Sequence, residues 1–144
     1  MTKNHVIHPY LNFEGRCDEA LEFYRKAVGA EVQFLMRYKD APESAKAQMS
    51  NTVNQDKVMH ARVRIGDSAI MASDGRCIGQ PDFKGIALSL TVPDPAAAER
   101  AFKALAEGGS AQMPLGKTFF SPAFGMCSDK FGVGWMVYVE TQPE

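Results

Sequence analysis

The sequence predicts an α+β fold built from two similar modules, each running strand, helix, strand, strand, strand. An alternating apolar run followed by an amphipathic helix pattern occurs twice in the 144 residues. The second copy follows the first at an offset of 79 residues for the strand and 77 for the helix, as expected of a duplicated unit. Three further candidate strands follow each helix pattern. We therefore expect one domain of two modules.

The first module is expected to cover about residues 1–75. Apolar and polar residues alternate over 7–13, which predicts its opening strand. A helix is predicted over 17–28, because Ala20, Leu21 and Tyr24 share one stripe with Ala27 and Val28, and Gly29 ends it. The three strands that follow are predicted at Glu31 to Tyr38, Lys57 to Ile65 and Ser68 to Ser73.

A polar segment from Lys39 to Asp56 separates two of these strands. A segment of this length is uncommon inside a compact domain unless it has a role, so a lid over a site and a passive loop are both open interpretations. A short helix within it is compatible with its sequence.

The second module is expected over about residues 83–144, after a linker at about 75–82. Its opening strand alternates from Ile86 to Val92. In the helix that follows, Asp94 is a suitable cap, Pro95 suits the first turn, and Gly108-Gly109 ends the pattern. Its remaining strands are predicted at Ala111 to Leu115, Ala123 to Ser128 and Val133 to Glu140.

Composition excludes several functional classes. The chain has 16 basic and 17 acidic residues and a formal net charge of -1, so it lacks the positive charge that nucleic-acid or membrane-surface binding needs. No stretch approaches the ~20 apolar residues of a membrane span, and we expect a cytoplasmic protein. The three cysteines, Cys17, Cys77 and Cys127, are far apart and are expected to be reduced thiols.

Several strings in both modules resemble one superfamily. They are the repeated module itself, the string from Glu19 to Gly29 and the closing string from Asp129 to Trp135. Together they resemble the vicinal oxygen chelate superfamily of glyoxalases, bleomycin-resistance proteins and extradiol dioxygenases. The runs Pro9 to Gly15 and Val58 to Asp67 look most like its PhnB-like branch.

This resemblance implies the glyoxalase-like fold, in which each module curls into a half-open sheet with its helix on the convex side and a ligand pocket on the concave side. Strand alternation agrees, because one face of each strand must pack on the helix. The residues that this leaves for the pocket are His8, Tyr10, Asn12, His60, Arg62, Arg64, Ala87, Ser89, Thr91, Met136, Tyr138 and Glu140.

Metal-using members of the superfamily present histidines and a carboxylate to one divalent ion. His8 matches the first ligand position, but Ala87, Met136 and Met71 stand at the other positions, and none of the three suits a hard cation. His60, or Glu140 at the rim, offers only a thin replacement set. We therefore predict no metal or other cofactor, with a metal-dependent lyase or isomerase of glyoxalase type as the alternative.

The remaining polar residues define the candidate site. Arg62 and Arg64 share a face with His60, where they would bind a carboxylate or phosphate or else be simply solvated. His8 and His60 are the candidate catalytic residues, although a structural role is the usual one for a histidine. The candidate ligand-binding residues are Tyr10, Asn12, Arg62, Arg64, Ser89 and Tyr138.

Two further groups have open interpretations. Phe119, Phe120 and Phe124 could line a pocket for a flat ligand or belong to the core, whereas Trp135 has the parity of a packing residue. Asp74 could be an acid or base at the rim, but its Ser-Asp-Gly context favours a plain turn.

The sequence thus predicts a PhnB-like protein that binds a small anionic or carbonyl-bearing molecule in a concave pocket, with any chemistry metal-independent. Whether it is an enzyme stays open, and a non-catalytic drug-sequestering protein of bleomycin-resistance type is a further alternative. Some relatives carry the label of ubiquinone-pathway methyltransferases, but the chain has no Gly-x-Gly-x-x-Gly after a strand, which argues against a nucleotide-binding domain. We expect a homodimer, with no nucleic-acid or membrane partner.

Overall fold

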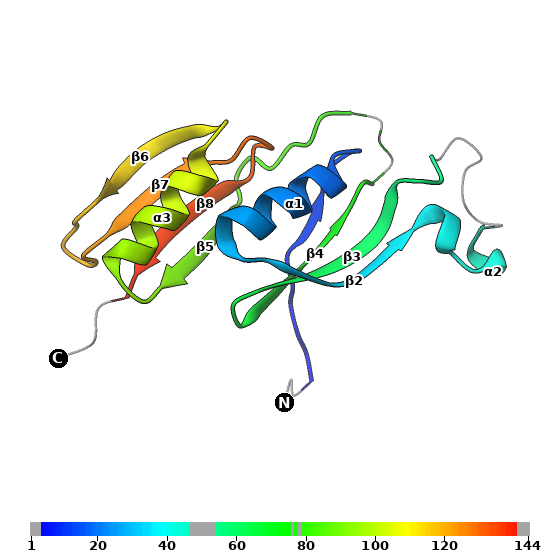
Figure 1. The fold of residues 1–144 in the computed structure, drawn as a ribbon, viewed down its shortest axis with the longest axis horizontal. Coiled ribbons are helices and arrows are strands. Elements are labelled where there is room, and N and C mark those ends of the chain that lie inside the picture. The colour runs from blue at the N-terminus through cyan, green and yellow to red at the C-terminus, as the bar shows by residue number, and fades with distance from the viewer. Residues whose placement is uncertain (1–3, 47–53, 76, 78, 141–144) are drawn as a thin grey trace. The chain divides into compact units, whose positions relative to one another are not determined.

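A computed structural model describes residues 4–46, 54–75, 77 and 79–140 of the chain (Figure 1). The chain divides into two compact units, one of Met1–Arg25 and Gly29–Gln80 and the other of Lys26–Val28 and Pro81–Glu144. Within the described residues, no helix is both long enough and apolar enough to cross a membrane.

The first unit is a four-stranded mixed sheet with one long helix on one face. Its strands have the order β1-β4-β3-β2, in which β1 is parallel to β4 and the other neighbours are antiparallel. The elements are β1 (Tyr10–Asn12), α1 (Cys17–Val28), β2 (Glu31–Arg37), the 3-10 turn η1 (Tyr38–Asp40), α2 (Glu43–Lys46), β3 (Val58–Ile65) and β4 (Ser68–Ser73).

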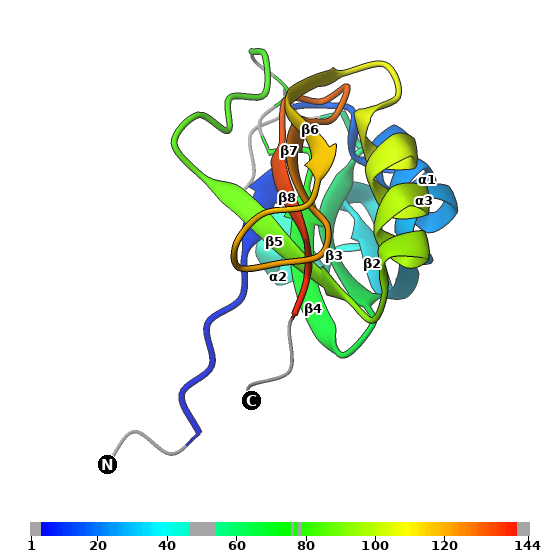
Figure 2. The same cartoon turned by 90° about the vertical axis from the view of Figure 1, so that its left-hand side faces the viewer.

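The second unit repeats this plan. Its sheet has the order β5-β8-β7-β6, again with the first strand parallel to the last. Figure 2 shows α3 lying along one face of the sheet. The elements are β5 (Ala87–Val92), α3 (Pro95–Ala106), β6 (Ser110–Gly116), β7 (Phe124–Ser128) and β8 (Gly134–Val139). The predicted fold class is confirmed, down to the order of elements in each module.

The two long helices begin by different means. The Asp94 side chain accepts a hydrogen bond from the Ala97 N–H at 2.8 Å, so α3 has the predicted cap. The residue before α1, Arg16, makes no such bond, and the Cys17 N–H donates instead to Asp74, which is distant in sequence, at 2.7 Å. At its other end α1 stops at Gly29, whose φ of 71° favours glycine.

Each sheet has a buried face under its helix and an opposite face, which we call the open face. In β1, β3, β4, β7 and β8 the helix-side residues are buried and most residues in alternate positions are half-buried or exposed, whereas β2, β5 and β6 contain no buried residue. Trp135 is only 3% exposed and its indole N–H donates to Asp129 at 2.9 Å, which confirms that it is a packing residue. The other buried apolar residues include Leu11, Ala61, Val63, Ile70, Ala72, Cys127, Val137 and Val139 in the strands and Ala20, Leu21, Tyr24, Ala98, Ala101 and Leu105 in the helices.

The structure corrects the predicted start of the first strand and describes the long polar segment only in part. The opening strand begins at Tyr10 and not at Ile7, which is 96% exposed and packs against no helix. In the long polar segment, the Tyr38 and Lys39 N–H groups bond the carbonyls of Lys57 and Gln55, so its two ends are held together. It contains the short helix α2, while residues 47–53 lie outside the described part, so its action as a lid stays a prediction.

Candidate functional site

The open face of the first sheet carries a row of four directly paired residues. Register places Tyr10 beside Met71, Met71 beside Arg62, and Arg62 beside Phe34. The four side chains come from β1, β4, β3 and β2 in turn, so the row crosses the whole sheet. Tyr10 and Phe34 are about half exposed, at 48% and 47%, and Met71 and Arg62 are half-buried. A cation is therefore held between apolar and aromatic side chains.

His60 lies next to this row. It precedes Arg62 by two residues on β3, and its Nδ1 atom is 3.1 Å from the hydroxyl oxygen of Tyr10. The Phe34 ring lies near its other side, with ring centroids 6.0 Å apart. Since the Tyr10 hydroxyl occupies Nδ1, the Nε2 atom is the ring nitrogen that can meet a ligand. The structure thus brings together two of the predicted residues, Tyr10 and His60.

The two predicted arginines have different partners. The Arg64 guanidinium forms an ion pair with Glu31 at 2.7 Å on the exposed surface. The Arg62 Nε–H donates to the amide oxygen of Gln33 at 3.2 Å, which is a neutral partner. Among the residues that the structure describes, Arg62 forms no ion pair. Within that part of the chain the positive charge of Arg62 has no acidic partner, whereas that of Arg64 is balanced.

His8 and Asn12 flank the row without joining a network. His8 is half-buried just before β1, and Asn12 is exposed at the end of β1. His8 forms no hydrogen bond or ion pair with any residue in the described ranges, and the structure provides no contact between it and His60. The two candidate catalytic histidines are therefore not shown as a pair.

Phe34 was not predicted as a site residue. The pairing of β2 with β3 is irregular between Val32 and Phe34, so simple alternation counted from Glu31 assigns the wrong face beyond that point. Nothing in the local sequence marks this irregularity. The same irregularity recurs in β6 between Ala111 and Met113, at the equivalent place in the repeat.

The open face of the second sheet is chemically different. At positions equivalent to the first row it carries Ser89, Met136, Met126 and Met113, paired in that order across the sheet. A second row carries Thr91, Tyr138 and Phe124. The predicted residues Ser89 and Tyr138 thus do lie on an open face, exposed and half-buried respectively.

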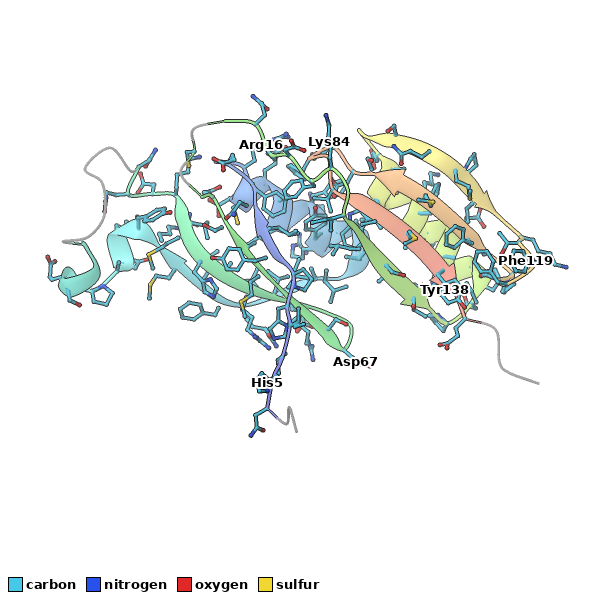
Figure 3. All side chains as sticks on the ribbon, turned by 180° about the vertical axis from the view of Figure 1, so that it is seen from behind. His5, Arg16, Asp67, Lys84, Phe119 and Tyr138 are labelled. Carbon is cyan, nitrogen blue, oxygen red and sulfur yellow. The ribbon has the colours of Figure 1, made fainter. Side chains whose placement is uncertain are left out.

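An aromatic cluster adjoins this second row. The Phe120 ring stacks on Tyr138 with centroids 6.1 Å apart and contacts Phe124 edge-on at 5.0 Å. Phe119 contacts Phe120 at 5.1 Å and is fully exposed. Figure 3 shows Phe119 and Tyr138 at the same end of the sheet. These phenylalanines are surface residues, so assigning Phe119 and Phe120 to the core is wrong.

The residues at the family's metal-ligand positions do not fit a divalent ion. Met71 and Met136 are thioethers, which suit soft monovalent ions, and Ala87 has no donor atom. Within the described ranges, no three His, Cys, Asp or Glu residues come together in a way that could hold a metal. Of the four positions at which metal-using members of the superfamily hold their ligands, only that of His8 has a side chain suited to a divalent ion. No chemical step is therefore assigned to a metal.

Asp74 is not an acid or base at the rim. Its side chain is 0% exposed, and its carboxyl oxygens accept hydrogen bonds from the Cys17 and Val58 N–H groups, both at 2.7 Å. It therefore joins the start of α1 and the start of β3 to the end of β4. Burial, and then the nearby Asp74, raise the pKa of the Cys17 thiol far above its ordinary value.

Comparison with known proteins identifies relatives along most of the chain. The model of a family described as 3-demethylubiquinone-9 3-methyltransferase matches residues 5–138. The protein YjdN of Escherichia coli strain K12 is 34% identical over 141 residues, which are 94% of this chain and 96% of YjdN.

Solved structures agree with these matches. Protein PA1353 of Pseudomonas aeruginosa is 44% identical with a TM-score of 0.82, covering 96% of this chain and all of that one. The PhnB protein of Bacillus cereus is 26% identical with a TM-score of 0.76, over 94% of this chain and 99% of its own. A glyoxalase, bleomycin-resistance and dioxygenase domain from Frankia sp. EAN1pec, at 14% identity and a TM-score of 0.60, shares the fold alone, over 97% of this chain and all of that one.

Proposed function

The chain belongs to the PhnB-like family described as 3-demethylubiquinone-9 3-methyltransferase, and on that premise we propose that it binds a small anionic or carbonyl-bearing molecule on the open face of its first sheet. Arg62 is the anchor for the ligand's negative or polar oxygen atoms. Tyr10 and Phe34 hold its apolar part, and Asn12 contributes a polar group at the edge. Any chemistry at this site is performed by side chains without a metal.

The uncompensated charge of Arg62 is the observation that carries this proposal. A half-buried guanidinium between Phe34 and Met71 has lost part of its hydration, and Gln33 replaces only one hydrogen bond and none of the charge. A carboxylate or phosphate oxygen would restore both. Arg64 already has Glu31 as its ion-pair partner, so we do not propose that it binds the ligand directly.

His60 gives the site a group that can move a proton. When the Tyr10 hydroxyl donates to Nδ1, the proton of neutral His60 is on Nε2 and can be donated to a ligand oxygen. When His60 donates to Tyr10 instead, Nε2 becomes the acceptor for a ligand proton. Tyr10 is therefore suited to orient the ring in either role. His60 is our first candidate for a catalytic residue, and His8 is the second.

Methyl transfer, which the family description names, is not the activity we propose. A methyl donor with a nucleotide group needs a site such as the glycine-rich turn of a parallel sheet. Each sheet here has a single parallel pair of strands, and the Gly132-Val133-Gly134 string leads into β8 and not into a helix.

Calorimetric titration with benzoate, phenylphosphonate and benzyl alcohol, which has neither a charge nor a carbonyl group, tests the proposal. Benzoate and phenylphosphonate are expected to bind, and benzyl alcohol to bind at least tenfold more weakly. Replacing Arg62 by Gln is expected to weaken benzoate binding by ~1.5–3 kcal/mol, the range for a hydrogen bond to a charged group.

Arg64→Gln is the matched control, because it removes the same charge from the same strand at a position that Glu31 already neutralises. It is expected to leave benzoate affinity within about twofold of the wild-type value, since surface ion pairs contribute little. Equal affinity for benzoate and benzyl alcohol, unchanged in Arg62→Gln, would refute anion binding at this face.

The metal-dependent alternative has its own test. Protein purified without chelator is expected to contain well under one equivalent of any divalent metal, because His8 alone cannot supply enough coordination energy. Stoichiometric metal that is lost in His8→Ala would instead favour the glyoxalase-type enzyme.

A further inference from the structure

The strands of the second sheet contain no charged residue. None of the strands β5, β6, β7 and β8 contains an acidic or basic residue, whereas β2 and β3 together contain Glu31, Arg37, Arg62 and Arg64. The two sheets have the same strand order, so this contrast holds between equivalent surfaces. Lys117 and Glu140 follow the ends of β6 and β8, so a ligand in the middle of the second face would meet no charged strand residue.

Thioether groups dominate the middle of this face. Met113, Met126 and Met136 are paired directly across three neighbouring strands. Met113 is 45% exposed and the other two are half-buried. Methionine sulfur is polarisable, its side chain adapts to different shapes, and it contacts aromatic rings favourably. Methionines that belonged to a core would be buried. A row of methionines that stays partly exposed on a surface is typical of a binding face.

The aromatic cluster of Phe119, Phe120, Phe124 and Tyr138 extends the methionine row. Phe124 and Tyr138 are the next open-face pair along β7 and β8 after Met126 and Met136. Phe120 stacks on Tyr138 with an interplanar angle of 26° and is still 37% exposed, so part of its ring surface can contact a ligand.

Hydrogen bonds fix the loop that presents these rings. The Ser121 hydroxyl is buried and donates to the Val139 carbonyl at 2.6 Å, and the Ser121 N–H donates to the Thr118 hydroxyl at 3.0 Å. The Thr118 N–H in turn bonds the Ser121 carbonyl. A loop that is ordered in this way presents Phe119 and Phe120 with little entropy left to lose on binding.

We propose that the open face of the second sheet, from the methionine row to the aromatic cluster, binds a small uncharged planar aromatic compound. The ring lies against the thioethers and is bordered by Phe120 and Tyr138. The absence of charge in β5 to β8 selects neutral rings, because a charged group placed there would be desolvated without a partner. This face belongs to the second unit and Arg62 to the first, and the proposal does not depend on anion binding at Arg62.

Titration with the neutral fluorophore N-phenyl-1-naphthylamine tests this inference on the full chain. The dye is expected to bind saturably, with increased fluorescence. Phe120→Ala and Met126→Gln are each expected to weaken binding by roughly 3- to 10-fold, the loss expected for one aromatic or sulfur contact. The matched control is Met36→Gln on the open face of the first sheet, which should bind the dye as the wild type does.

A second measurement on the unmodified protein avoids the risk that a variant folds poorly. With methyl-13C methionine, the dye is expected to shift the resonances of Met113, Met126 and Met136 more than those of Met36 and Met71. Largest shifts at Met36 or Met71, equal weakening by Met36→Gln, or no saturable binding would overturn the inference. So would conversion of a dimer to monomers by Phe120→Ala, because the face would then be an interface between copies.

Each of the two proposals can be refuted without affecting the other. Arg62→Gln is expected to lose benzoate binding and keep dye binding, whereas Phe120→Ala is expected to do the reverse. Loss of dye binding in Arg62→Gln would contradict the assignment of the dye to the second sheet, and the absence of benzoate binding in the wild type would contradict only the proposed function.

Discussion

Asp74 shows how one residue can be essential to the fold while resembling a site residue in the sequence. An acidic residue in a Ser-Asp-Gly string after a strand is typical of a turn. Its two buried hydrogen bonds go to Cys17 and Val58, which lie far away in the sequence. No local pattern records partners at such distances, so sequence reasoning could not find this role.

We predict that Asp74→Asn destabilises the protein by about 3 kcal/mol, the cost of losing a charged hydrogen bond and leaving a buried N–H unpaired. The asparagine amide group would face a backbone N–H donor where an oxygen is needed. Urea unfolding would measure the change. Asp67→Asn, at the exposed turn between β3 and β4, is the control and should change stability by no more than about 0.5 kcal/mol. A loss at Asp74 as small as that would contradict its joining role.

The cysteines allow a prediction about reactivity. All three are free, with Cys17 and Cys127 buried and Cys77 exposed. Burial, and then Asp129, raise the pKa of the Cys127 thiol to about 11. Burial, and then Asp74, also raise the pKa of Cys77 above its ordinary 9.0. The thiolate is the reactive form, so accessible Cys77 should react slowly at pH 8.

We therefore expect one thiol to react with Ellman's reagent in the native protein and three in urea. The native rate should still be rising at pH 9, because the raised pKa delays thiolate formation. Cys77→Ser should abolish the native reaction. Two reactive thiols in the native protein would place Cys17 or Cys127 at the surface.

At the scale of elements, periodicity located the helices well and the strand ends less well. The helix over 17–28 agrees with its prediction at both ends, because Gly29 and the apolar stripe are local signals. The first strand was predicted to begin at Ile7, but its hydrogen bonds with β4 end where the Met71 N–H bonds the Pro9 carbonyl. A strand's length is set by its partner, which an alternating pattern does not reveal.

The candidate site could be predicted from the sequence to a similar extent. Strand parity correctly placed Tyr10, His60 and Arg62 on one open face, because these strands are regular at those residues. It missed Phe34, which follows an irregularity in β2. It also did not distinguish Arg62 from Arg64, since the partner Glu31 belongs to another strand.

Close packing of α3 on its sheet depends on Gly125 in β7. A Cβ atom there would lie 2.8 Å from the Phe102 ring and 3.0 Å from the Leu115 Cα. We predict that Gly125→Ala destabilises the protein by ~1–3 kcal/mol, the usual cost of overpacking. Thermal unfolding would measure it, with Gly116→Ala in β6 as the control, because only open space surrounds that position apart from one carbonyl at 4.0 Å. Equal effects of the two substitutions would contradict the tight contact.

At the scale of the whole molecule, the expected dimer is a prediction that the exposed apolar residues support. Ile7 and Ile86 occupy equivalent places in the repeat and are 96% and 69% exposed. Burying a large aliphatic side chain contributes roughly 1.5–3 kcal/mol, so residues of this kind favour association. We expect sedimentation to show a dimer at micromolar concentration.

The double variant Ile7→Ser, Ile86→Ser is expected to shift the dimer toward monomer by at least about 100-fold in dissociation constant, because each subunit would lose both side chains from the interface. Phe120→Ala should remain dimeric. A wild-type protein that is monomeric at micromolar concentration would refute the assembly we expect.

The parallel pairing within each unit has a consequence for synthesis on the ribosome. Tyr10 belongs to the first strand to emerge, but Met71, its partner, follows about sixty residues later, which at ~5–20 residues per second is a delay of several seconds. The hairpin of β3 and β4 can close as soon as it appears, since Ile65 and Ser68 are neighbours in the chain. The nascent first strand must therefore wait, unpaired, until the last strand of its unit has been made.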